Sequence, residues 1–140
     1  MELTRRRVLA IGTGVFAATA MAGLPAFANA TDDAIAALTG GASLGEGAIT
    51  LTAPEIAENG NTVPISVDAP GAVAITLFAE GNPTPSVATF KFGPLSASRS
   101  AATRIRLAGT QNVIAVAEME DGSFQMAKAN VKVTIGGCGG

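Results

Sequence analysis

From Gly47 onward the chain is cut into short apolar runs by turn-forming residues, and this segmentation limits the folds open to it. The turn signals, rich in Gly, Pro, Asn and Asp, lie at 58–61, 69–71, 81–85, 93–94, 109 and 121–122. Seven strands are predicted between them, at 48–53, 62–68, 73–79, 86–92, 101–108, 112–118 and 124–135. Short strands spaced in this way predict an all-β fold, an antiparallel immunoglobulin-like β-sandwich.

Several of these runs alternate between apolar and polar side chains, as strands with one buried face do. Thr103, Ile105 and Leu107 are predicted to face inward, while Arg104 and Arg106 face solvent. A tight hairpin is predicted where Asp-Gly at 121–122 separates two apolar runs.

The last predicted strand changes phase along its length. Phe124 and Met126 share one parity, whereas the apolar residues from Val131 to Ile135 have the other, which would place Ile135 in the core. A β-bulge between residues 127 and 130 is predicted to reconcile the two halves.

Residues 1–30 have the pattern of a targeting segment. Arg5, Arg6 and Arg7 open it, an apolar run follows to Gly23, and small residues offer cleavage after 28 or 30. The consecutive arginines predict a twin-arginine export signal and a periplasmic location. The alternative is a membrane anchor, but the run is shorter than the roughly 20 residues that span a bilayer.

After the signal, residues 31–135 are predicted to form one domain, which opens with a short helix. Thr31 is the predicted N-cap, and Gly40-Gly41 is the predicted stop. Loss of residues 1–30 removes three arginines and one glutamate, which leaves six basic and ten acidic side chains and a net charge of −4. An acidic domain is a poor candidate for nucleic acid or for an anionic membrane surface.

Composition excludes most catalytic and metal-binding chemistry for this chain alone. It has no histidine and one cysteine, so a Ser-His-Asp triad, a His-ligated metal or haem, an internal disulfide and an Fe–S cluster are all ruled out. No cofactor is therefore expected, and no residue is assigned a catalytic role. The carboxylates Glu118, Glu120 and Asp121 are interpreted as a charged turn rather than a cation site, and Arg104 and Arg106 as a solvated face.

The chemistry-bearing residue is Cys138, in the run Gly136-Gly137-Cys138-Gly139-Gly140. Four glycines give the backbone freedom and no side chain to dock, so 136–140 is predicted to be a flexible arm. A catalytic thiol needs a fixed position beside a base, which this setting does not provide. It suits a thiol that carries a covalent group into the pockets of other proteins. The alternative is a structural or adhesion-type sandwich that dimerises through Cys138.

At these residues the chain resembles the SoxY family, the sulfur-carrier subunits of periplasmic thiosulfate oxidation. The resemblance covers the whole chain after the signal. Its motifs include PEIAENGNTVP at 54–64, ATF at 88–90, FGP at 92–94, TRIRLA at 103–108, AEM at 117–119, DGSF at 121–124 and GGCGG at 136–140.

The resemblance implies a carrier and not an enzyme. Cys138 would receive thiosulfate from a haem-bearing SoxAX-type enzyme as an S-thiosulfonate, and a SoxB-type hydrolase would release sulfate and leave a persulfide. Where a SoxCD-type dehydrogenase is present, the outer sulfur would be oxidised further. A SoxZ-like subunit is the expected partner in a heterodimer, no cofactor is bound, and neither nucleic acid nor, after signal cleavage, membrane is involved.

Overall fold

The computed structural model describes residues 26–136 of the 140. Within that range it contains one helix and nine strands. Their bounds are α2 (Ala26–Thr39), β1 (Leu44–Gly45), β2 (Thr50–Thr52), β3 (Ile56–Ala57), β4 (Val63–Asp68), β5 (Ala72–Ala79), β6 (Ser86–Lys91), β7 (Ser100–Ile105), β8 (Gln111–Met119) and β9 (Phe124–Val133). All seven predicted strands are present, in an immunoglobulin-like sandwich.

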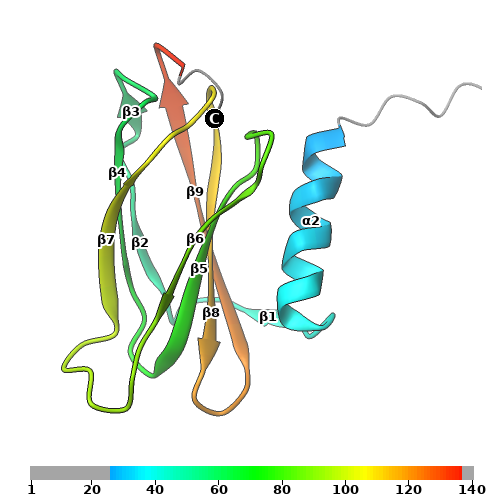
Figure 1. Ribbon diagram of the computed structural model, residues 1–140, viewed down its shortest axis with the longest axis vertical. Coiled ribbons are helices and arrows are strands. Elements are labelled where there is room, and N and C mark those ends of the chain that lie inside the picture. Colours follow the sequence, from blue (N-terminus) through cyan, green and yellow to red (C-terminus); the bar gives the residue numbers. More distant parts are fainter. Residues whose placement is uncertain (1–25, 137–140) are drawn as a thin grey trace, which may run out of the picture.

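Two sheets face each other (Figure 1). The larger has the strand order β1-β9-β8-β5-β6 with β3 added to β9, and the smaller has the order β2-β4-β7. The long pairings are antiparallel, whereas β1 and β3 each pair with β9 in parallel, at Leu44↔Phe124 and Ile56↔Lys132. These two short strands were not predicted, because two residues are too few to show an alternating pattern.

The core between the sheets is made by inward-facing aliphatic side chains. Its fully buried members include Val63, Ile65 and Val67 of β4, Ile75 and Leu77 of β5, Val113 of β8 and Val131 of β9. The predicted inward side of β7 is confirmed, since Ile105 and Leu107 are buried while Arg104 and Arg106 are exposed.

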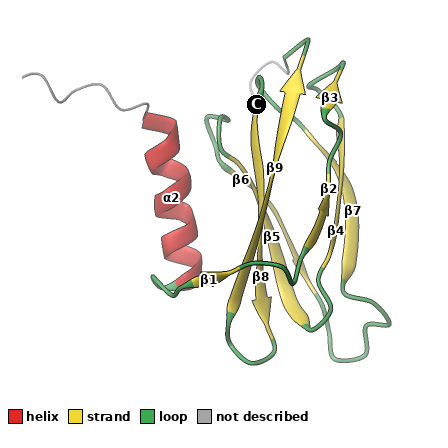
Figure 2. Cartoon of the chain, turned by 180° about the vertical axis from the view of Figure 1, so that it is seen from behind, coloured by secondary structure: helices red, strands yellow, loops and turns green. Residues whose placement is uncertain are grey.

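Helix α2 lies against the outer face of the larger sheet (Figures 1 and 2). Ile35 packs there against Phe78, Ile114 and Val116, which form a second apolar cluster. The predicted stop is confirmed, because Gly40 and Gly41 follow the helix with φ of 65° and 82°.

The predicted start of the helix is wrong. The helix begins at Ala26, so Thr31 lies inside it, 1% exposed, rather than at the N-cap. Alanine, the strongest helix former, occupies positions 26, 28 and 30 and extends the helix beyond the capping signal.

The predicted bulge in the last strand is also wrong. Pairing between β8 and β9 is regular from Gln111↔Val131 to Glu118↔Phe124. The phase changes because Phe124 and Met126 belong to the cluster under α2, whereas Val131 faces the interior of the sandwich. Each half of β9 therefore presents its apolar side chains to a different core.

Candidate functional site

The arm itself lies mostly outside the described residues. Gly137, Cys138, Gly139 and Gly140 are not described, so the structure shows the base of the arm at Ile135 and Gly136. We call this end of the sandwich the arm end; it includes the loops at 58–62, 80–85 and 106–110. The opposite end, with the loops at 69–71, 92–99 and 120–123, is called the hairpin end (Figure 1).

Hydrogen bonds hold the chain in place up to the last residue before the arm. Past the end of β9, the Thr134 amide donates to the Ala57 carbonyl at 3.0 Å, and its hydroxyl donates to the Glu58 carbonyl at 3.0 Å. The Ile135 carbonyl then accepts from the Gly60 amide at 2.7 Å. The anchor of the arm is therefore a fixed point on the sandwich.

Ile135 does not join the core, contrary to the prediction from its parity. It is 67% exposed, because β9 ends at Val133 and the carbonyl bond from Gly60 holds Ile135 beyond the edge of the sandwich.

Gly60 joins the arm base to a second loop. It is buried, and while its amide donates to Ile135, its carbonyl accepts from the Leu107 amide at 2.7 Å. The sequence indicated only a turn at this position. In the structure the turn also connects the end of β9 to the 106–110 loop.

The first glycine of the arm has a packing role. A Cβ at Gly136 would overlap the carbonyl oxygen of Ala108 and lie 3.3 Å from its carbonyl carbon. No larger residue fits there without a backbone shift. Gly136, expected only to loosen the chain, allows the arm base to lie directly against the 106–110 loop.

The 106–110 loop is itself held by a buried pair of amide side chains, Asn82 and Gln111. Asn82 Nδ2 donates to the Arg106 carbonyl at 2.8 Å, and its Oδ1 accepts from the Ala108 amide at 2.9 Å. Gln111 Nε2 donates to Asn82 Oδ1 at 2.9 Å and to the Gly109 carbonyl at 3.0 Å. Gln111 Oε1 accepts from the Gly81 amide at 2.9 Å, so every side-chain nitrogen and oxygen of the pair has a partner. The pair therefore fixes the surface on which Gly136 rests.

Sequence reasoning missed this pair. Asn82 lies in a Gly-Asn-Pro turn signal, and Gln111 precedes a strand, so each has a local explanation. They are 29 residues apart, and only the fold brings them together.

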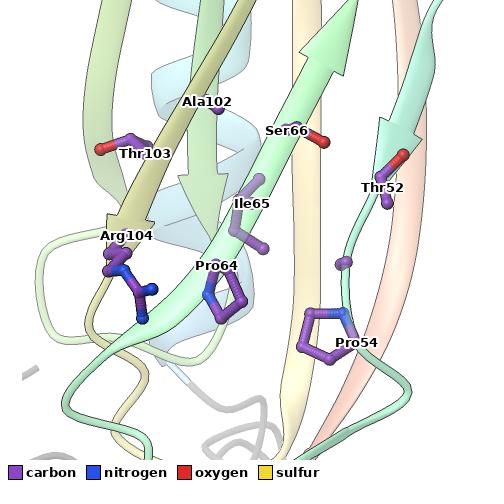
Figure 3. A pocket seen from close by; sticks show the side chains of 9 residues that line it. Thr52, Pro54, Pro64, Ile65, Ser66, Ala102, Thr103 and Arg104 are labelled. Carbon is purple, nitrogen blue, oxygen red and sulfur yellow. The ribbon is translucent and has the colours of Figure 1, made fainter.

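A shallow groove of 590 Å³ opens on the outer face of the smaller sheet, close to the arm end. Figure 3 shows its lining residues, of which only Arg104 is charged. Arg104 Nη1 donates to the Thr62 hydroxyl at 3.4 Å, so its guanidinium lies next to the loop that carries Gly60. Arg104 and Arg106 are both exposed, in line with the solvated face that the sequence indicated.

Charge is distributed unevenly between the two ends. Near the arm end, three acidic residues (Glu55, Glu58, Glu80) are balanced by three basic residues (Arg104, Arg106, Lys132). Near the hairpin end, five acidic residues (Glu46, Asp68, Glu118, Glu120, Asp121) outnumber two basic ones (Lys91, Arg99). An anionic group attached to the arm would therefore lie near the end of the domain whose acidic side chains repel it less.

Two acidic residues of the hairpin end, Glu120 and Asp121, have structural partners. Glu120 pairs with Arg99 at 3.2 Å. The hydroxyl and amide of Ser123 donate to the Asp121 carboxylate, and these bonds lower the pKa of Asp121 below its usual 3.8. Among residues 26–136, no group of three or more His, Cys, Asp or Glu side chains is arranged to hold a metal ion, and no helix is long and apolar enough to cross a membrane.

Comparisons with solved structures give two kinds of relative. The sulfur carrier protein SoxY from Chlorobium limicola f thiosulfatophilum is 41% identical, with a TM-score of 0.67, over 77% of this chain and 99% of its own. A superoxide reductase (neelaredoxin) from Ignicoccus hospitalis is 17% identical, with a TM-score of 0.55, over 62% of this chain and 80% of its own. The second likeness concerns the fold alone.

A search of curated proteins found no match. The family model described as "Sulfur oxidation protein SoxY" matches residues 35–138, a span that runs from the helix to the cysteine of the arm. The chain therefore belongs to the SoxY family.

Proposed function

We propose that this chain carries sulfur intermediates of thiosulfate oxidation as covalent adducts of Cys138. The observation that carries the proposal is its 41% identity to a sulfur carrier protein across 99% of that protein's length. The family match, which ends at Cys138, and the arm base fixed at Ile135 both support it. A fixed anchor followed by glycines around a thiol suits a group that must be presented to several enzymes.

The proposed cycle needs no catalytic group from the chain. Joining the Cys138 sulfur to the outer sulfur of thiosulfate releases the thiol proton and passes two electrons to a SoxAX-type haem enzyme. A SoxB-type hydrolase then adds water, so that sulfate and a proton leave and a persulfide remains on Cys138. Where a SoxCD-type dehydrogenase is present, the outer sulfur is oxidised and hydrolysed in turn. Gly136, Gly137, Gly139 and Gly140 form the arm, and this chain itself is proposed to bind no metal or cofactor.

Residues 1–30 are proposed as a twin-arginine signal, which places the protein in the periplasm. Both cleavage positions, after 28 and after 30, fall inside α2. Cleavage there leaves helix residues 29–39 or 31–39, and both fragments keep Ile35, the contact with the larger sheet. Mass spectrometry of the exported protein gives its first residue directly.

A SoxZ-like subunit is the proposed stable partner, in a heterodimer. The twin-arginine route exports folded proteins, and the chain has no cofactor motif that would explain folding before export, so a partner that travels with it is the better explanation. Co-expression of the two subunits should yield one complex on a sizing column. A stable monomer that does not bind the second subunit would contradict this part of the proposal.

The carrier role is tested by substitution of the one thiol. Cys138→Ser should abolish thiosulfate-dependent respiration while leaving thermal unfolding unchanged, because no hydrogen bond of the described domain depends on residue 138. In the matched control, Cys138→Ser is combined with Ser96→Cys, which moves the thiol to an exposed loop at the hairpin end. This double variant has one free thiol, as the native chain does, and should also be inactive.

Intact-mass spectrometry of protein from cells grown on thiosulfate supplies the second readout. Thiosulfonate and persulfide adducts should occur on the native chain and be absent from both variants. If Cys138→Ser only removes a disulfide-linked dimer and leaves respiration intact, the chain is instead a structural sandwich dimerised through Cys138.

A further inference from the structure

We propose that Ile56 and Ile135 form an apolar docking patch for the enzymes that act on Cys138. This arm-base patch deepens the proposed function and rests on it. The partner it fits is an enzyme with a recessed reaction centre, whose channel mouth is lined by apolar side chains.

The length of the arm makes contact at its base unavoidable. Cys138 follows Ile135 by three residues, so the two Cα atoms are at most about 10 Å apart at roughly 3.3–3.6 Å per residue. A reaction centre that reaches the sulfur through a channel of that depth brings the channel mouth onto Ile135. Whatever surrounds the arm base is therefore part of every productive complex.

Large exposed apolar side chains are concentrated where this contact occurs. Among residues 30–136, whose burial the structure describes, four large apolar side chains have more than a third of their surface exposed. Two of them, Ile56 at 58% and Ile135 at 67%, are at the arm end. Ile56 pairs with Lys132, three residues before Ile135. Because Ile135 follows Lys132 by three residues, its Cα lies at most about 10 Å from the Cα of Lys132, the residue paired with Ile56. One channel mouth can therefore cover both isoleucines.

The backbone under the patch is already fixed. Residues 55–57 are tied to β9 by the Lys132 amide, which donates to the Glu55 carbonyl at 2.9 Å, and by the Thr134 amide, which donates to the Ala57 carbonyl at 3.0 Å. Ile135 is held by the bond from Gly60. Side chains on a preformed backbone lose little freedom on binding, which favours a brief but specific contact.

The charge balance at the arm end also favours an apolar contact. Acidic and basic side chains are equal in number at the arm end, so neither sign dominates around the patch. An apolar contact is also insensitive to the charge of the adduct, which changes between thiol, thiosulfonate and persulfide. The same patch can therefore serve enzymes that act on different intermediates.

The test uses the mature chain in complex with its co-expressed partner subunit. Ile56→Ser, Ile135→Ser and the double variant are compared with Leu95→Ser, which alters a 98% exposed leucine at the hairpin end. The first readout is KM for the carrier in the enzymatic conjugation of thiosulfate. The second is the rate of alkylation of Cys138 by iodoacetamide, a reagent too small to need a docking surface.

We expect each single arm-end substitution to raise KM about five- to tenfold and the double substitution to raise it further, with kcat nearly unchanged. Leu95→Ser should leave KM unchanged, and all variants should be alkylated at the native rate. Thermal unfolding checks that each variant is folded. If Ile56→Ser does not fold, the KM of Ile135→Ser alone tests the proposal, since residue 135 lies past the end of β9.

Four results would overturn the proposal: a native KM for the double variant, an equal rise in KM for Leu95→Ser, loss of the partner subunit from the double variant on a sizing column, or a change in the self-association of that variant. Loss of the partner subunit would assign the patch to the stable partner. A change in self-association would assign it to a second copy of this chain. Failure of the carrier role is separate, because it appears as activity retained in Cys138→Ser.

Discussion

Both ends of the sandwich are held by hydrogen bonds, but the bonds connect different parts of the chain. At the hairpin end, Asp121 and Ser123 close a tight turn within three residues, and of the side chains described there only that of Arg99 makes long-range hydrogen bonds, to Ala72 and Glu120. At the arm end, the ties are long-range: β3 to β9, Gly60 to Ile135, and Asn82 to Gln111. Local ties shape a turn, whereas long-range ties fix the position of a point on the surface. The arm leaves from such a point.

The substitution Asn82→Ala is the strongest test of this difference between the two ends. The Arg106 carbonyl and the Ala108 amide lose their partner, and Gln111 loses one acceptor, so we expect the free energy of unfolding to fall by about 2–4 kcal/mol. Denaturant unfolding measures this loss. Amide hydrogen exchange should accelerate at 106–110 and at 134–136 together, because the first segment supports the second. Faster exchange confined to 80–85 would show that the two loops are independent.

Arg99→Leu is the corresponding change at the hairpin end. Arg99 Nη1 donates to the Ala72 carbonyl at 3.0 Å and Nη2 pairs with Glu120, whose side chain is mostly exposed. We expect a loss of about 1–2 kcal/mol, mainly from the backbone carbonyl, since the exposed ion pair contributes little. Exchange at 134–136 and thiosulfate oxidation should stay native. Reduced activity at equal stability would mean that the two ends are coupled.

Two glycine substitutions separate crowding from backbone strain. Gly136→Ala meets the Ala108 carbonyl, whereas Gly122→Ala has open space but must adopt a φ of +84°. Each should lower stability by about 1 kcal/mol. Only Gly136→Ala should slow the enzymatic conjugation of thiosulfate, because only it displaces the arm base. Equal conjugation rates for the two variants would contradict a positional role for Gly136.

The smallest expected effect is the pH dependence of the hairpin. Because bonds from Ser123 lower the pKa of Asp121, the folded state holds its proton less tightly than the unfolded chain does. The resulting stabilisation is fully present above pH 3.8 and is lost as the pH falls through the lower pKa of the folded protein. Urea unfolding of the native chain and Ser123→Ala, from pH 6 to pH 2.5, should show the two curves converging at low pH. A difference in the free energy of unfolding that stays constant with pH would exclude a contribution from the Asp121 pKa.

Predictability from sequence differs between the fold and the site. Alternation with period two and strong turn residues made the seven long strands predictable, because both signals are local. The β1 and β3 strands were not, since a parallel pair of two residues depends on where β9 lies. The phase change in β9 was visible at Phe124 and Met126, but its cause, a helix packed on the outer face, is a tertiary contact.

The same distinction applies to the site. Cys138 and its glycines stand out in sequence because their chemistry is unusual. The roles of Gly60, Asn82 and Gln111 could not be inferred, because all the partners that give them these roles except Gly109 lie 24 to 75 residues away along the chain. The sequence therefore indicates where the reactive thiol is, while the structure shows how the base of the arm is positioned.

The long pairing of β9 has a mechanical consequence. In the proposed cycle, withdrawal of the arm from an enzyme's channel would pull β9 along its own axis, toward the arm end. Hydrogen bonds in an antiparallel ladder run perpendicular to the strands, so such a pull loads the eight residue pairs between β8 and β9 in shear, all at once, rather than peeling them apart singly. The β3 pairs on the other side of β9 share this load. The strand that bears the arm is thus the one best placed to resist repeated traction.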